Sequence, residues 1–188
     1  VREHCGSDAA DGSCVLSAPT GCASFLLRSG ASTAHRTYSV PVGYCGPLPP
    51  QHARFKALQR RLAQARLAVL DEFSMLGQQF MGKILYRANR ALEPYARDSG
   101  LASKSMGGMD VVLSGHAAQL KAVGDYRLWK RWKKGFYDGK ALNRCPKGGT
   151  PGGPLPRSLV HDSQLFMREF EDVAMLLQLH LWSPRAGE

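Results

Sequence analysis

Short apolar runs, each closed by a turn residue or by acidic residues, constrain the fold of this chain more than any other feature. Runs of this length are typical of strands that are buried on both faces of a sheet. The runs are residues 14–18, 67–70, 109–113 and 173–179. Because segments with helical spacing lie between them, the pattern predicts an α/β fold with a parallel sheet.

The intervening segments have the composition and spacing of amphipathic helices. We expect helices over residues 20–28, 52–65, 75–92 and 159–170. Thr20 is placed near the cap of the first helix. Residues 29–44 are mixed in character and are broken by Pro41. The side chains predicted to face the core are Phe55, Leu58, Leu62, Met75, Phe80, Met81, Ile84, Leu85 and Ala88.

Basic residues outnumber acidic ones. The chain has 25 Lys and Arg against 15 Asp and Glu, so its formal net charge is 25 − 15 = +10. Such a surplus suits a polyanionic partner, because each neutralised phosphate releases counterions. A basic protein without such a partner would carry the same charge, so charge alone leaves both interpretations open.

The cysteines argue against a zinc ribbon and against a disulfide framework. There are five of them and no CxxC pair occurs, so reduced thiols in an intracellular compartment fit best. No run of about 18 apolar residues is present, which predicts no membrane span. No signal peptide is visible, and the chain begins with Val1, which suggests a fragment.

Asp71 and Glu72 directly follow the apolar run at residues 67–70. A strand that ends in two acids presents them at the carboxyl edge of a parallel sheet, where ligands bind in open α/β folds. Motor ATPases use such a pair, with one acid holding Mg²⁺ and the next orienting the attacking water. An apolar run that meets a helix-capping acid is also common, so this pair alone does not decide the function.

Three further segments accompany this pair in a fixed order. They read APTGCA at residues 18–23, GASTAH at residues 30–35 and GGMDVVLSGHAAQL at residues 107–120, with LDEFSM at residues 70–75 between the last two. Together they resemble the ordered motifs of the Pif-type and RecD-like superfamily-one DNA helicases. Those helicases read APTG-x-A, G-x-T-x-H, DE-x-SM after an apolar strand, and GG-x-apolar-GD-x-x-QL.

The resemblance covers roughly residues 14–124, and more faintly residues 159–181. It implies a RecA-like P-loop NTPase sheet with helices on both faces, lacking its N-terminal P-loop strand. It also implies ATP and Mg²⁺ as cofactors. Asp71 would bind Mg²⁺, Glu72 would activate water, and Gln119 would sense the terminal phosphate.

The resemblance also implies a track for nucleic acid. Thr20 and Gly21 would lie along the backbone of single-stranded DNA at a strand-to-helix turn, where free N–H groups suit phosphate. Thr33 and His35 would contact the same strand or the duplex fork. Without the resemblance, Thr20 could be only a cap, His35 a loop histidine and Gln119 a surface polar group.

Several positions depart from the helicase pattern. No GxxxxGK[ST] loop, which would cradle the phosphates, occurs in the chain. His116 stands where the family has Asp, and Leu181 stands where an Arg would reach the γ-phosphate. A leucine cannot stabilise the charge of transferring phosphate as a guanidinium would. The chain alone is therefore expected to be inactive as an ATPase.

The resemblance divides the chain into four parts. They are a loose lead-in at residues 1–13, a partial motor domain at residues 14–124, a basic aromatic and Gly/Pro-rich excursion at residues 125–157, and a helix and strand at residues 158–188 that lead toward an absent second motor domain. The excursion contains YRLWKRWKKGFY at residues 126–137, which could stack on bases or could pack on the domain.

The function implied is ATP-dependent unwinding of single-stranded and forked DNA in genome maintenance, including repair, recombination and telomere maintenance. An intracellular, nuclear location follows from that role. The alternative from another class is a non-catalytic, single-stranded DNA-binding remnant of such a helicase. A basic scaffold protein without a nucleic-acid role would require the four motifs to be coincidental.

Overall fold

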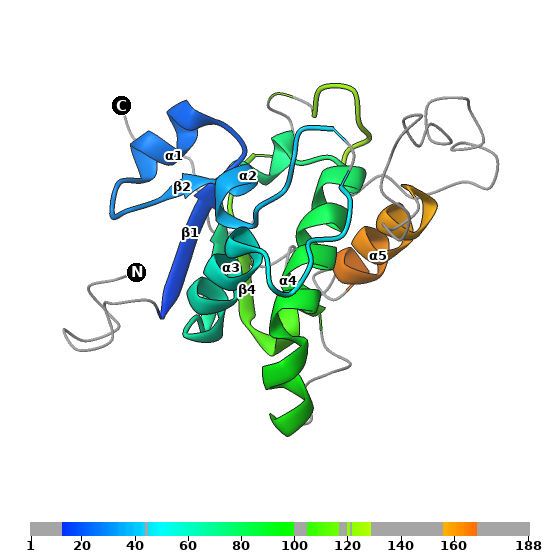
Figure 1. The fold of residues 1–188 in the computed structure, drawn as a ribbon. Helices are drawn as coiled ribbons and strands as arrows, with labels where there is room; N and C mark the ends of the chain where they lie inside the picture. Colours follow the sequence, from blue (N-terminus) through cyan, green and yellow to red (C-terminus); the bar gives the residue numbers. More distant parts are fainter. Residues whose placement is uncertain are drawn as a thin grey trace, which may run out of the picture.

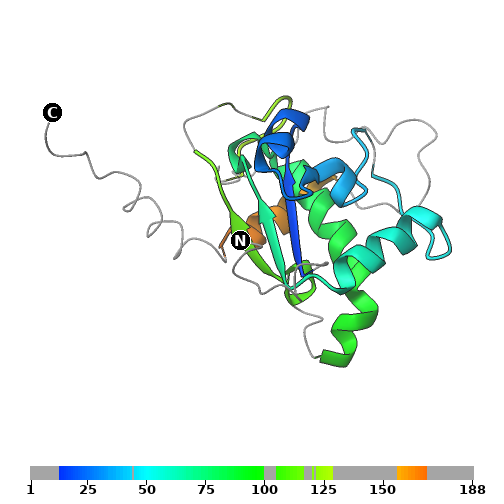
Figure 2. The same cartoon turned by 90° about the vertical axis from the view of Figure 1, so that its left-hand side faces the viewer.

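A four-stranded parallel sheet forms the centre of the protein (Figures 1 and 2). The computed structural model describes residues 13–43, 45–99, 105–116, 120, 122–128 and 156–168. The strands are β1 (Cys14–Ala18), β2 (Ser32–Thr33), β3 (Leu67–Leu70) and β4 (Asp110–Leu113). Their order across the sheet is β2-β1-β3-β4, and every pair is parallel. The predicted α/β class with a parallel sheet is confirmed.

Helices follow the strands along the chain. They are α1 (Gly21–Leu27), α2 (Ala34–Thr37), α3 (Ala53–Ala63), α4 (Gln78–Ser99) and α5 (Pro156–Arg168), with 3-10 turns η3 (Phe73–Met75) and η4 (Ser105–Gly108). Among the described residues, no helix combines the length and the hydrophobicity needed to cross a bilayer.

Local caps explain where α1 and α3 begin. The Oγ1 atom of Thr20 accepts a hydrogen bond from the backbone N–H of Ala23 at 3.2 Å. The Nδ1 atom of His52 accepts one from the backbone N–H of Arg54 at 3.1 Å. Side-chain acceptors of this kind satisfy amide groups that a first helical turn leaves without a partner. Both predicted helices are confirmed.

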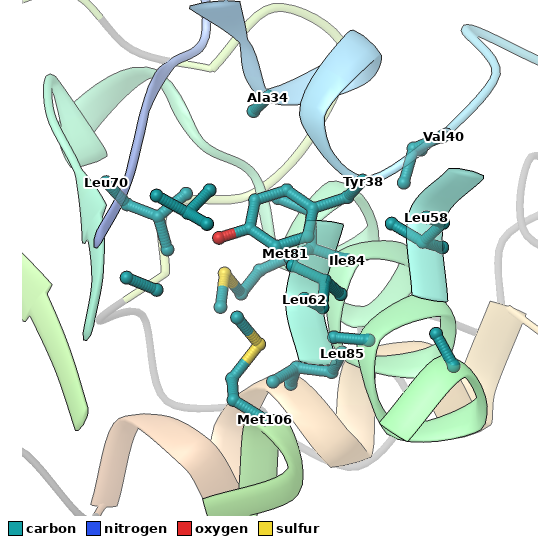
Figure 3. Close-up of a cluster of buried hydrophobic side chains, with 14 of the residues drawn as sticks. Ala34, Tyr38, Val40, Leu58, Leu62, Leu70, Met81, Ile84, Leu85 and Met106 are labelled. Atoms are coloured by element: carbon teal, nitrogen blue, oxygen red, sulfur yellow. The ribbon is translucent and has the colours of Figure 1, made fainter. Parts of the chain in front are cut away.

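One hydrophobic core lies between the sheet and the helices α3 and α4 (Figure 3). Val15, Ala68 and Leu70 face it from β1 and β3. The side chains that meet them from the helices include Leu58, Leu62, Met81, Ile84 and Leu85, all nearly or fully buried. Phe166 of α5 joins the same core, where α5 packs beside α4.

Two local predictions were wrong or incomplete. Met75 was expected in the core of a helix but lies half-buried in η3, and α4 begins only at Gln78. The cause is tertiary, because Leu76 is extended and Gly77 forms an antiparallel bridge with Arg127. The mixed segment at residues 29–44 contains β2 and α2, which are too short to show a periodic pattern.

The predicted strand at residues 173–179 lies outside the described residues, as does most of the predicted excursion. Residues 125–128 of that excursion are described and pack on α4 through hydrogen bonds to its first turn.

Candidate functional site

The carboxyl ends of the four strands meet at one edge of the sheet, because all the strands are parallel. This is the edge at which open α/β folds bind ligands. Thr33 closes β2, Thr20 follows β1, Asp71 follows β3, and Ser114 follows β4. The strand order therefore places the residues predicted to contact DNA on one side and the predicted catalytic acids in the middle.

Asp71 and Glu72 are both half-buried at this edge. The backbone N–H of Asp71 donates to the carbonyl oxygen of Ser17 at 2.9 Å, which continues the β1–β3 pairing beyond the strand. Within the described part of the chain, neither carboxylate makes a hydrogen bond or an ion pair with another side chain. Both are therefore available to a ligand.

Glu72 adopts a left-handed backbone conformation, with φ 51° and ψ 43°. This conformation costs a residue with a side chain roughly 1–2 kcal/mol, so tertiary contacts must hold it. The amide N–H of Ser114 donates to the carbonyl of Leu70 at 3.0 Å, and that of Phe73 donates to the carbonyl of Ser114 at 2.9 Å. These two bonds join the turn after β3 to the turn after β4 on both sides of Glu72.

Gly115 is the residue that allows this close approach. Its φ is +143°, and a Cβ atom there would lie 2.9 Å from the backbone nitrogen of Phe73 and 3.1 Å from the Cα atom of Glu72. Real Cβ atoms essentially never approach other atoms under 3.0 Å. Only glycine fits between the two turns without displacing the backbone of Glu72.

The acids suit a magnesium ion that arrives with a nucleotide rather than one held in a protein cage. No group of three or more His, Cys, Asp or Glu side chains that could hold a metal occurs among the described residues. Mg²⁺ commonly uses one or two carboxylates together with substrate phosphates and water. The unpaired Asp71 carboxylate, with Glu72 beside it, fits that requirement.

Thr20 and Gly21 lie at the turn from β1 into α1. The Thr20 hydroxyl is already used as the acceptor that caps α1, so the structural role that its sequence position suggested is present. Gly21 is exposed, and a Cβ atom there would meet nothing within 4 Å. The predicted contact of these two residues with DNA stays a prediction.

Thr33 and His35 lie at the turn from β2 into α2. The Thr33 hydroxyl accepts a hydrogen bond from the N–H of Arg36 at 3.4 Å. The imidazole of His35 stacks on the ring of Phe80 in α4, with the ring centroids 4.2 Å apart and the planes 25° apart. Burial, followed by the nearby charge of Lys83, lowers the pKa of His35 below its ordinary value of 6.5. Its imidazole is therefore neutral at neutral pH.

Three cationic side chains donate hydrogen bonds to backbone carbonyls of α2 and of the segment that follows it, residues 36–46. The Nη1 atom of Arg61 donates to the carbonyls of Thr37 and Arg36 at 2.6 and 3.1 Å. Lys83 Nζ donates to the carbonyl of Gly43 at 2.7 Å. One turn further along α4, Arg87 Nη2 donates to the carbonyl of Gly46 at 2.6 Å. These three cations are part of the basic surplus and are engaged by the protein itself.

The structure adds residues to the site that the sequence did not assign to it. Phe80, predicted as a core residue, packs against the core and is also the half-buried platform under His35. Gly115 belongs to the sequence motif at residues 107–120, but its contact with Phe73 and Glu72 could not be inferred from the sequence, because those residues are distant along the chain. Asp125 accepts hydrogen bonds from the backbone N–H groups of Gln79 and Phe80, and no local pattern signals this role. Gln119, the predicted phosphate sensor, lies outside the described residues.

The match to a known family covers this edge of the sheet. Residues 9–127 match the family model described as PIF1-like helicase, which is more than half of the chain. The chain belongs to the PIF1-like helicase family. The predicted recognition is confirmed, and the ordered motifs described above all fall within the matched residues.

Several solved structures of Pif1 helicases are similar to this PIF1-like chain. The Bacteroides Pif1 bound to single-stranded DNA is 24% identical, with a TM-score of 0.45, over 65% of this chain and 26% of that one. The Bacteroides Pif1 with ADP-AlF3 and single-stranded DNA is 26% identical, with a TM-score of 0.44, over 58% of this chain and 24% of that one.

The Pif1 helicase from Candida albicans is 24% identical, with a TM-score of 0.44, over 62% of this chain and 25% of that one. The chain thus spans about a quarter of the length of these helicases. Among curated proteins, no sequence matches it.

Proposed function

We propose that this PIF1-like chain is part of an ATP-dependent DNA helicase motor. The observation that carries the proposal is the order of residues along one sheet edge. Two unpaired acids follow β3, and the candidate DNA contacts follow the two strands on one side of it. Because the two sets of residues lie on neighbouring strands, a conformational change caused by nucleotide binding or hydrolysis at the acids can alter the residues that would contact DNA. We further propose a role in genome maintenance and, from that role, an intracellular, nuclear location.

In this proposal the Asp71 carboxylate would hold Mg²⁺, and Glu72 would orient the attacking water. Bound Mg²⁺ would neutralise charge that develops on the transferring phosphoryl group. Hydrolysis also requires a phosphate-binding loop, which this sequence does not contain. We therefore propose that another segment supplies that loop, and that this chain by itself does not turn over ATP.

Thr33 and His35 would bind single-stranded DNA without contributing charge. The lowered pKa of His35 leaves its imidazole neutral, so it can form hydrogen bonds or stack but does not neutralise phosphate. The charge-dependent part of binding must then come from Lys and Arg side chains. Removing the two side chains should weaken binding at every salt concentration by a similar factor.

The test is fluorescence anisotropy of a labelled single-stranded oligonucleotide across a salt series. The native chain should bind, and its affinity should fall steeply with salt. A Thr33→Ala/His35→Ala double variant should bind roughly tenfold more weakly, the size expected for one or two lost hydrogen bonds, with an unchanged salt slope. His161→Ala is a matched control, because His161 is exposed on α5.

The outcomes separate the candidate functions. A folded native chain that does not bind at low salt contradicts the DNA-binding proposal. If the chain binds, DNA-stimulated phosphate release should be measured after a phosphate-binding loop is supplied on a second segment. Release that Glu72→Gln abolishes supports the motor, whereas binding without any release favours the non-catalytic alternative.

A further inference from the structure

Asp125 fastens the segment after β4 to the first turn of α4. Its Oδ2 atom accepts hydrogen bonds from the backbone N–H groups of Gln79 and Phe80 at 2.9 and 3.2 Å. Its Oδ1 atom accepts one from the N–H of Tyr126 at 2.8 Å. Asp125 thus satisfies two amides at the start of α4 that have no carbonyl partner within the helix. It acts as a helix cap supplied from 45 residues away.

The neighbouring residues reinforce this attachment. The N–H of Gln78 donates to the carbonyl of Tyr126 at 2.9 Å, and its buried side-chain amide donates to the carbonyl of Arg127 at 3.0 Å. Gly77 leaves room for the carboxylate, because a Cβ atom at residue 77 would collide with the side chain of Asp125. The sequence therefore provides both the cap and the space that the cap occupies.

The first turn of α4 is also where the candidate DNA contact rests. Phe80, whose N–H binds Asp125, carries the ring on which His35 stacks. Lys83, one turn later, holds the carbonyl of Gly43 in the segment that follows α2. A change in the direction of this first turn would therefore move the support under His35.

We propose that Asp125 is a positioning residue that acts through Phe80 to hold His35 where it contacts single-stranded DNA. The inference rests on the proposed DNA-binding function. It adds a residue, outside the four sequence motifs, on which the geometry of the DNA track depends.

Two readouts test the proposal in the full 188-residue chain: the NMR titration of His35, assigned with a His35→Asn variant, and affinity for a labelled single-stranded oligonucleotide. Asp125→Ala should raise the pKa of His35 toward 6.5, because the imidazole becomes less buried when the Phe80 ring moves away. It should weaken DNA binding about fivefold, the loss expected for roughly one contact.

Three further variants separate positioning from charge and from general stability. Asp125→Asn removes the charge but keeps a cap acceptor, so it should restore most of the native affinity. Asp110→Ala removes the same charge from an exposed site at the amino end of β4 and should change neither readout. Gly77→Ala should reproduce the effect of Asp125→Ala, because it displaces the carboxylate.

The double variant Gly77→Ala/Asp125→Gly gives the sharpest outcome. A Cβ atom at residue 77 would collide with both the carboxylate and the Cβ atom of Asp125. Glycine at residue 125 removes both groups, so the double variant should bind DNA no more weakly than Asp125→Gly alone. Full addition of the two effects would overturn the proposal. So would a pKa and a DNA affinity that stay native in Asp125→Ala while its unfolding temperature falls.

If Asp125→Ala does not fold, Gly77→Ala carries the same test, with Asp125→Asn as the variant that should stay close to native. Absence of DNA binding by the native chain would remove the proposed function. In that case the titration of His35 alone would still decide whether Asp125 positions it.

Discussion

Gly115→Ala should destabilise the chain through backbone strain next to Glu72. The new methyl group would lie 2.9 Å from the backbone nitrogen of Phe73. The backbone of residue 115 would also have to keep a φ of +143°, which residues with side chains rarely adopt. The Phe73 nitrogen cannot move aside cheaply, because its hydrogen bond to the carbonyl of Ser114 is part of the link between the two turns. A residue held in such a conformation costs about 1–3 kcal/mol.

For a chain of this size, that cost lowers the unfolding temperature by about 2–12 °C, at about 2–4 °C per kcal/mol. Thermal unfolding followed by circular dichroism measures it. Gly43→Ala is the matched control, because a Cβ atom there meets nothing within 4 Å and no positive φ is required. Its effect should stay within about 0.5 kcal/mol.

The same variant should separate the two halves of the site. β4, which precedes Gly115, and β2, which carries Thr33, lie at opposite edges of the sheet. Single-stranded DNA affinity should therefore stay native in Gly115→Ala while hydrolysis by a complete motor falls. An unfolding temperature equal to that of the native chain would refute the steric reasoning, and a loss of DNA affinity would refute the separation.

Three other expectations can be checked on the same protein. The pKa of His35 lies below 6.5 in the folded state. The contribution of neutral His35 to the free energy of unfolding is therefore complete above pH 6.5 and is lost as the pH falls through the lowered pKa. The difference in unfolding temperature between native and His35→Asn chains should therefore shrink below pH 6.5. Leu62→Ala, at a fully buried core position, should cost about 2–5 kcal/mol in urea unfolding. Thr20→Ala should cost about 1 kcal/mol by removing the cap of α1, and Thr20→Ser should restore it.

Local patterns in the sequence were sufficient to predict three of the four strands and the position of the acids. An apolar run between polar breakers has few other stable placements, so β1, β3 and β4 lie where the runs predicted them. Parallel strands bring their carboxyl ends together, so the strand pattern alone predicts Asp71 and Glu72 at the sheet edge. The caps of α1 and α3 were also local, since each involves residues two or three positions apart.

Tertiary contacts decided the remaining features. β2 has two residues and depends on its pairing with Ser17 and Ala18, which no window of sequence can show. The start of α4 depends on Asp125 and on the bridge between Gly77 and Arg127, whose residues are about fifty positions apart.

The stack of His35 on Phe80 likewise joins segments that are brought together only when α2 and α4 pack on the same core. The sequence by itself determined which elements form and which chemistry ends each strand, because those depend on neighbouring residues. Only the folded chain decided how the candidate DNA contact is supported, because that support comes from hydrogen bonds and ring contacts between residues far apart along the chain.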